Sequence, residues 1–275
     1  MEEAQDRIGL RVRVRSSAAA GQRFAFAENW RKYNAAVTDE QREQARNSLE
    51  EWLGTLEGMT FLDAGAGSGV FAAAAGELGA QVTAFDFDPV GDWIDRGDVL
   101  DRDYMQSLGL FDVVYSWGVL HHTGRMWEAL ANACDAVAPG GRLYISIYND
   151  QGWRSKAWRV LKRTHGQIPS LLRPLYVGVV ITPLEARAAA KAILLRNNYL
   201  ASWRAPQGRG MSKWRDILDW VGGYPFEVAK PEEVLEFSRA RGFELEKLAT
   251  QGGSLGCNQF LFRRRDTLAA RTDED

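Results

Sequence analysis

The chain has 275 residues, of which 45% are hydrophobic and 25% are charged, and this composition is ordinary for a globular protein with a sizeable core. A formal net charge of −2 gives no overall attraction for nucleic acid, and the longest apolar stretch, Leu175 to Leu184, is too short to span a bilayer. With only two cysteines and a charged N-terminus, we expect a reduced, cytoplasmic protein that needs no metal.

Short apolar runs alternate with helical patterns along most of the chain. The predicted strands are, in chain order, Met59–Asp63, Gln81–Asp86, a short one at Ile94, Phe111–Ser116, Arg142–Tyr148, Phe243–Ala249 and Asn258–Arg263. The predicted helices are Phe24–Leu53, Val70–Leu78, Met126–Ala138, which Pro139 stops, and Pro231–Arg241. This alternation predicts an α/β fold with a doubly wound, mostly parallel, Rossmann-like sheet and an antiparallel final strand.

Residues 150–225 interrupt the alternation with helical patterns and no clear strand. Thirteen Lys or Arg but only four Asp or Glu fall between residues 150 and 220, with five of the ten tryptophans. We interpret this segment as a helical insertion after the fifth strand that forms a substrate lid; contact with an anionic membrane and RNA binding are alternatives. The predicted parts are an N-terminal arm with helices (1–58), a cofactor-binding core (59–149), the insertion (150–225), the C-terminal part of the core (226–265) and a tail (266–275).

A glycine-rich turn, Asp63-Ala-Gly65-Ala-Gly67-Ser-Gly69, joins the first core strand to its helix. Glycines allow a tight turn there and let backbone N–H groups approach a ligand. A dinucleotide site needs a glycine where this chain has Val70, and the Asp63 carboxylate would repel a pyrophosphate. That carboxylate suits a ligand with an ammonium group. Asp86, at the end of the next strand, can accept hydrogen bonds from ribose hydroxyls, which indicates an adenosine ligand.

Five segments, in the same order, resemble motifs of class I S-adenosylmethionine-dependent methyltransferases. They are Phe61–Phe71 with the glycine turn, Phe85–Pro89 with two acids, Gly97–Asp101, Phe111–His122 and Pro139–Leu143. The branch of the family that the chain resembles is that of the ubiquinone-biosynthesis O-methyltransferases. The resemblance implies S-adenosylmethionine as the cofactor and transfer of its methyl group to an acceptor.

The resemblance also implies which residues bind the cofactor. They are Asp63, Gly65, Gly67, Ser68 and Gly69 along the methionine part, Asp86 and Phe87 at the ribose, Asp98 and Val99 at the adenine, and Ser116 and Trp117 near the methyl group. The chain departs from the family between the second and third strands. Only the eight residues Pro89–Arg96 lie there, which is short for a crossover with a helix. We therefore expect a weakened or remodelled adenine wall.

Two adjacent histidines, His121 and His122, follow the fourth strand and are the candidate catalytic residues. An imidazole can remove a proton from a phenol or hydroxyl acceptor near neutral pH. His122 is preferred because it lies further into the loop. Tyr148 and Asn149 end the fifth strand, at the sheet edge where ligands bind, and Tyr148 is equally suited to the core.

These patterns together predict an enzyme that methylates a small, aromatic or lipid-like acceptor, with O-methylation favoured by the histidine base. The alternatives are a non-catalytic protein that binds adenosine or S-adenosylmethionine, and an RNA methyltransferase. Val70 and Asp63 disfavour an NAD-dependent oxidoreductase. Trp30 and Tyr33, in the first helical segment, are expected to pack on that helix rather than close over the cofactor.

Overall fold

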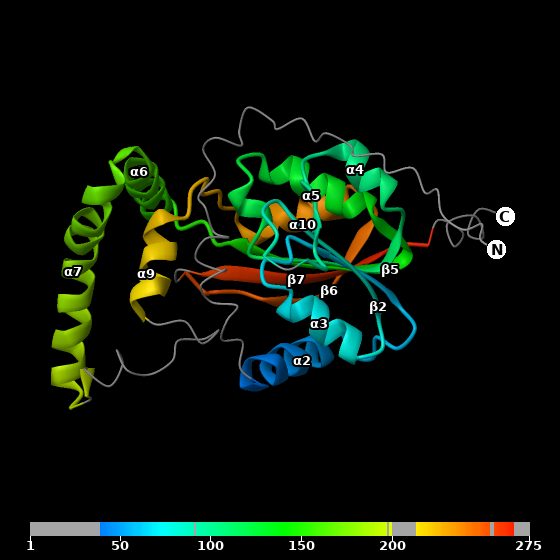
Figure 1. The fold of residues 1–275 in the computed structure, drawn as a ribbon, viewed down its shortest axis with the longest axis horizontal. Helices are drawn as coiled ribbons and strands as arrows, with labels where there is room; N and C mark the ends of the chain where they lie inside the picture. Colours follow the sequence, from blue (N-terminus) through cyan, green and yellow to red (C-terminus); the bar gives the residue numbers. More distant parts are fainter. Residues whose placement is uncertain (1–38, 91, 197, 200–212, 254–255, 267–275) are drawn as a thin grey trace, which may run out of the picture.

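The computed structural model describes residues 39–266, apart from 91, 197, 200–212 and 254–255 (Figure 1). Its described strands form one sheet in the order β3-β2-β1-β4-β5-β7-β6. They are β1 (Thr60–Ala64), β2 (Gln81–Asp86), β3 (Asp95–Arg96), β4 (Phe111–Trp117), β5 (Val137–Tyr148), β6 (Phe243–Ala249) and β7 (Cys257–Arg264). Strands β1 to β5 pair in parallel, whereas β7 is antiparallel to both β5 and β6. The predicted fold class is confirmed.

Helices cover both faces of this sheet (Figure 1). They are α2 (Asp39–Leu53), α3 (Val70–Glu77), α4 (Arg102–Ser107), α5 (Met126–Asp135) and α10 (Pro231–Arg239). Strand β1 explains the two layers, because its side chains alternate between the faces. Phe61 packs in the cluster under α2 and α3, and Leu62 packs in the cluster under α4, α5 and α10. Both are fully buried.

The boundary between α5 and β5 differs from the predicted one. The sequence predicts a helix to Ala138 that Pro139 stops, but α5 ends at Asp135 and β5 begins at Val137. Val137 is fully buried and pairs with Phe111 of β4. The register then shifts before the next pairs, and this irregularity admits proline and glycine into the strand. Pairing with β4 therefore outweighs the local helical pattern.

Two further elements differ from or refine the predictions. Helix α4 was not predicted; the Asp101 side chain begins it by accepting the N–H of Tyr104 at 3.1 Å. The third strand is reduced to the two residues of β3, and the described residues between β2 and β3 form turns without a helix. The predicted helix Phe24–Leu53 is confirmed from Asp39 onward, and its earlier part lies outside the described residues.

The insertion after β5 is helical, as predicted. Its described helices are α6 (Trp153–Gln167), the 3₁₀ turn η3 (Ser170–Leu172), α7 (Arg173–Leu194) and α9 (Lys213–Gly222). They pack around the buried side chains of Val177, Ile217 and Val221 at one end of the sheet (Figure 1). Within the described part of the chain, no helix is both long and apolar enough to cross a membrane.

The two ends of the insertion meet beside the end of β5. The N–H of Ala229 donates to the carbonyl of Tyr148 at 3.0 Å, and the N–H of Asp150 donates to the carbonyl of Ala229 at 3.1 Å. Asn149 and Ala229 thus form a parallel bridge. The chain leaves and rejoins the core at one point, at the sheet edge where open α/β sheets bind ligands.

Candidate functional site

The glycine turn lies between β1 and α3, at the carboxyl edge of the parallel strands. Gly65, Gly67 and Gly69 have positive φ angles of 97°, 56° and 77°, which other residues adopt only with strain. A Cβ atom on Gly65 would lie 2.5 Å from Val119, and one on Gly69 would lie 2.3 Å from the Trp93 ring. A Cβ atom on Gly67 would meet nothing within 4 Å. The turn is packed at both ends and open at Gly67, where a ligand can approach the backbone.

Asp86, the last residue of β2, holds this turn through one carboxylate oxygen and the start of the β2–β3 segment through the other. Oδ2 accepts the N–H of Gly67 and Oδ1 accepts the N–H of Asp88, each at 2.9 Å. Burial raises the pKa of Asp86, and these two hydrogen bonds act against that increase. A carboxylate oxygen can accept more than one hydrogen bond. Ligand hydroxyls can therefore bind Asp86 beside the backbone donors.

Asp63 lies near the end of β1 and is only 2% exposed. Its carboxyl group accepts the N–H of Ala72 in the first turn of α3. Burial, together with the nearby negative charge of Asp86, raises the pKa of Asp63 to about 8. Asp63 is therefore mostly protonated at neutral pH, and a cationic group placed beside it would favour the ionised form.

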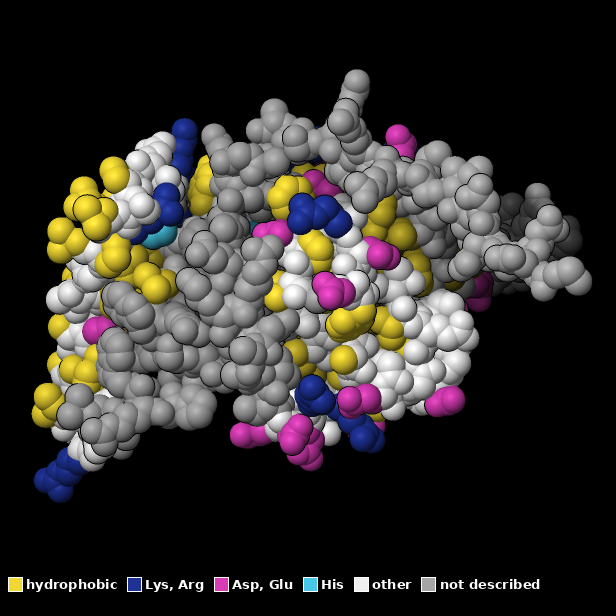
Figure 2. Space-filling view, viewed as in Figure 1, with side chains coloured by type: hydrophobic (Ala, Val, Ile, Leu, Met, Phe, Trp, Pro, Cys, Tyr) yellow, Lys and Arg dark blue, Asp and Glu magenta, His cyan; other side chains and the backbone are white. Residues whose placement is uncertain are grey.

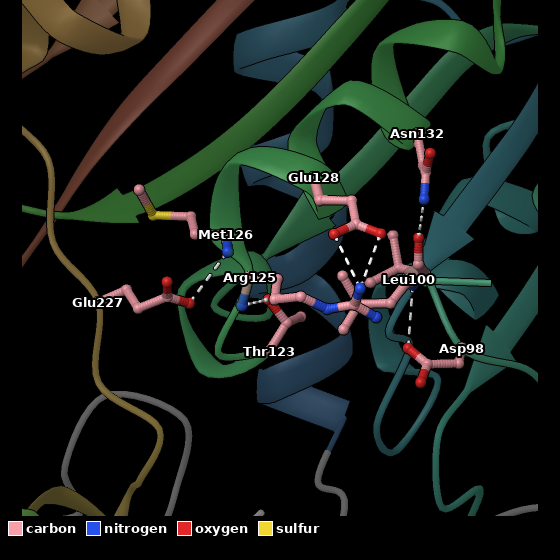
Figure 3. A network of polar contacts seen from close by, with 9 residues as sticks. Asp98, Leu100, Thr123, Arg125, Met126, Glu128, Asn132 and Glu227 are labelled. Atoms are coloured by element: carbon pink, nitrogen blue, oxygen red, sulfur yellow. Dashed lines mark hydrogen bonds and ion pairs between the residues drawn. The ribbon is translucent and has the colours of Figure 1, made fainter. Parts of the chain in front are cut away.

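The turn after β3 is fixed to helix α5 (Figure 3). Asp98 is 7% exposed and accepts the N–H of Leu100 at 3.0 Å. The Val99 carbonyl accepts a hydrogen bond from Asn132 Nδ2 of α5 at 2.8 Å. Because β3 pairs with the end of β2, this turn lies next to Asp86. Asp98 and Val99 thus adjoin the predicted ribose site, and their contact with adenine stays a prediction.

The short crossover between β2 and β3 brings an indole onto the glycine turn. Trp93 is 55% exposed, and its ring fills the space above Gly69. The crossover thus consists of turns with this tryptophan, next to the two-residue strand β3, and a remodelled adenine wall stays a prediction. Its effect on cofactor affinity stays a prediction.

The residues at the end of β4 differ in their surroundings. Ser116 is fully buried, and its Oγ donates to the carbonyl of Ala64 at 2.8 Å, which links β4 to β1. Trp117 is half-buried and packs against the core cluster under α2 and α3. Both lie near the carboxyl end of the central strands, as predicted, and Ser116 also has a structural role. Trp30 and Tyr33 lie outside the described residues.

The two histidines follow β4 in the 3₁₀ turn η2, Leu120–His122. His121 is fully buried, and its ring centroid lies 4.0 Å from that of Tyr148 on β5. His122 is half-buried, and its Nδ1 lies 2.7 Å from the carbonyl oxygen of Pro225. A carbonyl only accepts, so Nδ1 carries the proton, and Nε2 is the acceptor nitrogen of the neutral ring. His122 therefore has the tautomer that a base acting through Nε2 requires.

Residues 225–229, the return segment, lead from the insertion back to α10 and hold the histidine turn. The N–H of Glu227 donates to the carbonyl of His121 at 3.0 Å. Its Oε2 accepts the N–H of Met126 at 3.0 Å, at the start of α5 (Figure 3), and the carboxylate also accepts the N–H of Gly124. Burial raises the pKa of Glu227, and the two backbone donors act against that increase. The return segment thus positions both ends of the histidine loop.

Helix α6 holds the return segment from the side of the insertion. Arg159 Nε donates to the carbonyl of Phe226 at 3.1 Å. Lys162 is fully buried, donates to the carbonyl of Trp220, and lies 4.9 Å from the centroid of the Phe226 ring. That ring lies 5.1 Å from the ring of Tyr148. Contacts therefore run without a break from the insertion to the histidine turn.

Sequence reasoning missed Glu227, Phe226 and Arg159. The one local signal was a single carboxylate within the apolar run Tyr224–Ala229, and that pattern also suits a surface turn. Asn149 is tied to β7, because its Oδ1 accepts a hydrogen bond from Asn258 Nδ2 at 3.2 Å. Among the described residues, no three His, Cys, Asp or Glu side chains are grouped so that they could hold a metal ion.

Comparison with known proteins places these features in a family. A family model described as "Methyltransferase domain" matches residues 33–174. A ubiquinone biosynthesis O-methyltransferase of Methylobacterium sp. (strain 4-46) is 30% identical over 106 residues, which cover 34% of this chain and 43% of that protein. An uncharacterized protein of Synechococcus sp. is 34% identical over 107 residues, which cover 33% of this chain and 26% of that protein. The matches thus span less than half the length of these curated relatives.

A solved structure has the same fold. It is that of an O-methyltransferase family protein from Burkholderia thailandensis, which superposes with a TM-score of 0.50 at 14% sequence identity. The superposition covers 86% of this chain and 60% of that chain.

Proposed function

The chain belongs to the methyltransferase domain family, and from this membership we propose that it moves a methyl group from S-adenosylmethionine to a small-molecule acceptor. The observation that carries the proposal is the glycine turn. Its backbone is open at Gly67, and two acids, the buried Asp63 and the half-buried Asp86, lie beside it. This arrangement suits a ligand with a cationic end and a ribose.

The cofactor, when bound, supplies the electrophilic methyl group. The protein residues that we assign to it are Asp63 with Gly65, Gly67, Ser68 and Gly69 for the amino-acid part, Asp86 and Phe87 for the ribose, Asp98 and Val99 for the adenine, and Ser116 and Trp117 for the methyl end. The raised pKa of Asp63 supports its assignment, because an ammonium group would compensate a carboxylate that burial disfavours. The hydrogen-bonding capacity left on Asp86 supports the ribose assignment.

His122 is the residue that we propose as the base. The hydrogen bond from its Nδ1 to the Pro225 carbonyl leaves Nε2 as the nitrogen that can take a proton from an acceptor hydroxyl. His121 is fully buried, and we assign it a structural role in the histidine turn η2. A base of this kind favours O-methylation, because a hydroxyl must lose its proton as its oxygen forms the new bond.

The insertion, residues 150–225, is proposed as the lid over the acceptor. The rings of Phe226 and Tyr148 join it to the histidine turn. Phe226 is buried and supports the half-buried Tyr148, whose ring would offer an aromatic or lipid-like acceptor apolar surface beside His122. Replacing Phe226 with Ala is expected to raise the KM for the acceptor and to leave the Kd for S-adenosylmethionine unchanged. We also propose a cytoplasmic location, on the basis of the low cysteine content.

A panel assay tests the proposed function. Purified protein is incubated with S-adenosylmethionine and with phenols, hydroquinones, amines or bulk RNA, and release of S-adenosylhomocysteine is measured. We expect release with a phenol or hydroquinone, and its loss in His122→Asn. Cofactor binding without turnover on any acceptor would favour the non-catalytic alternative, and turnover on RNA alone would favour an RNA methyltransferase.

A further inference from the structure

The outer face of α7 exposes apolar side chains along its whole length. Figure 1 shows this helix at the far edge of the insertion, with α9 between it and the sheet. Leu175, Val179 and Ile193 are 69%, 66% and 75% exposed. With three smaller exposed residues they recur every three or four positions and so share one side of the helix. We name this set the outer stripe: Leu175, Val179, Thr182, Ala186, Ala190 and Ile193.

The outer stripe continues past both ends of the helix. Leu171 and Leu172 precede it at 88% and 51% exposure; Leu194, the last residue of α7, and Leu195, which follows the helix, are 82% and 56% exposed. Figure 2 shows hydrophobic side chains in yellow along this edge of the molecule. None of the stripe residues is charged, although the solvent face of a surface helix is normally polar. A contiguous apolar surface of this kind marks an interaction site.

Positive charge borders the outer stripe on one flank and lies on the neighbouring helix α6. Arg187 and Lys191 are exposed on one flank of α7, and α6 exposes Arg154, Lys156 and Arg163. Figure 2 shows dark blue side chains near both ends of the yellow band. Residues 150–220 hold thirteen of the chain's 34 Lys and Arg but only four of its 36 Asp and Glu. The insertion is therefore strongly basic, whereas the remainder of the chain is acidic.

We propose that α7 docks on an anionic lipid surface, with the outer stripe among the acyl chains and its basic flank at the headgroups. An amphipathic helix that lies in the interface plane uses this pairing of apolar and basic faces. The separation of charge in the chain orients the molecule, because the basic insertion is attracted to the membrane while the acidic core is repelled.

A second copy of the chain and RNA are two other partners for the outer stripe, and both fit it less well. A second copy of the chain would place two basic insertions against each other, and like charges at an interface oppose association. RNA needs basic or aromatic groups at the contact, and the outer stripe has neither. Of a second copy, RNA and a lipid surface, the lipid surface is the one that matches an apolar face with a basic border.

Vesicle flotation tests the proposal with the full chain. We expect the protein to float with phosphatidylcholine vesicles that contain about one third phosphatidylglycerol, and not with phosphatidylcholine alone. The double variant Leu175→Asp/Val179→Asp should reduce the fraction of protein bound to vesicles about tenfold or more. The variant Arg187→Glu/Lys191→Glu should also reduce the bound fraction, and this reduction should be larger at low salt than at high salt. Leu110→Asp is the matched control, because Leu110 is exposed to 56% but lies on the core.

Binding of S-adenosylmethionine, measured by calorimetry, checks that each variant is folded and keeps this test separate from the proposed methyl transfer. Absence of flotation with anionic vesicles would overturn the proposal. Equal flotation of the Leu175→Asp/Val179→Asp variant and the wild type would also overturn it. A wild-type dimer in light scattering that the same variant converts to a monomer, without vesicle binding, would assign the stripe to a second copy instead.

Discussion

Ionisation of Asp63 should couple cofactor binding to pH. Burial and the negative charge of Asp86 raise the pKa of Asp63 to about 8, whereas its ordinary value is 3.8. The contribution of Asp63 to folding stability is therefore complete below its ordinary pKa and is lost as pH rises toward 8. A ligand whose ammonium group pairs with the carboxylate must displace that proton, so binding should strengthen over the same range.

The size of the effect follows from the two protonation states. If only the ionised form binds, the apparent Kd exceeds its limiting value by a factor of one plus the ratio of protonated to ionised Asp63. With a pKa of about 8, the Kd should fall about 25-fold between pH 6 and pH 7.5, which corresponds to about 2 kcal/mol. Most of the cofactor's own amino group stays protonated in this window.

Calorimetry of S-adenosylmethionine binding measures this directly. Titrations at pH 6 in buffers of different ionisation enthalpy should detect close to one proton released per cofactor bound. Asp63→Asn is the control, since an amide keeps the shape but cannot ionise, and its Kd should be weak and nearly constant with pH. A wild-type Kd that does not change between pH 6 and 7.5, or an Asn variant that keeps the wild-type pH dependence, would refute the pairing of Asp63 with the ammonium group.

Three further substitutions test the site and its support. His122→Asn keeps a side-chain donor but lacks the Nε2 base, so kcat should fall about 10²–10⁴-fold in the S-adenosylhomocysteine release assay while the cofactor Kd is unchanged; a matching loss of cofactor affinity would argue against a base. Glu227→Ala leaves the buried N–H of Met126 without its acceptor, and the free energy of unfolding in urea should drop by about 1–3 kcal/mol; an unchanged midpoint would contradict this role. Gly69→Ala should lower the melting temperature through both its positive φ and its collision with Trp93, and adding Trp93→Ala should restore only the part due to the collision; full recovery would show that the backbone is not strained.

Local signals predicted the parts of the fold that depend on neighbours in the sequence. The strand–turn–helix around Gly65–Gly69 was read correctly, because apolar pattern and glycine spacing act within a few residues. The end of α5 was predicted wrongly, since Val137 is as compatible with a helix as with a strand until Phe111 is placed beside it. These two residues lie 26 positions apart in the chain, so a sequence pattern that spans about ten residues cannot show that they pair.

The candidate site also contains contacts that the sequence could predict and contacts that it could not. Asp63 lies near the carboxyl end of β1 and Asp86 ends the adjacent strand β2, so their meeting at one edge follows from the alternation of strands and helices. Glu227 reaches Met126 across 101 positions, and the insertion lies between them. The sequence could not predict that contact, because it depends on how the insertion returns to the sheet. The tautomer of His122 depends on the same return, through the Pro225 carbonyl.

The bridge between Asn149 and Ala229 makes the insertion an exchangeable module. A segment whose ends are already side by side adds little closure cost when it grows or shrinks, and it does not alter the register of the strands that flank it. An exchange at these two positions has to keep Pro225 and Glu227, because they hold the histidine turn. The rest of the insertion, which we propose as the lid and the docking surface, can then change while the glycine turn stays intact. Chimeras joined at the same two positions would test whether the insertion determines the acceptor range.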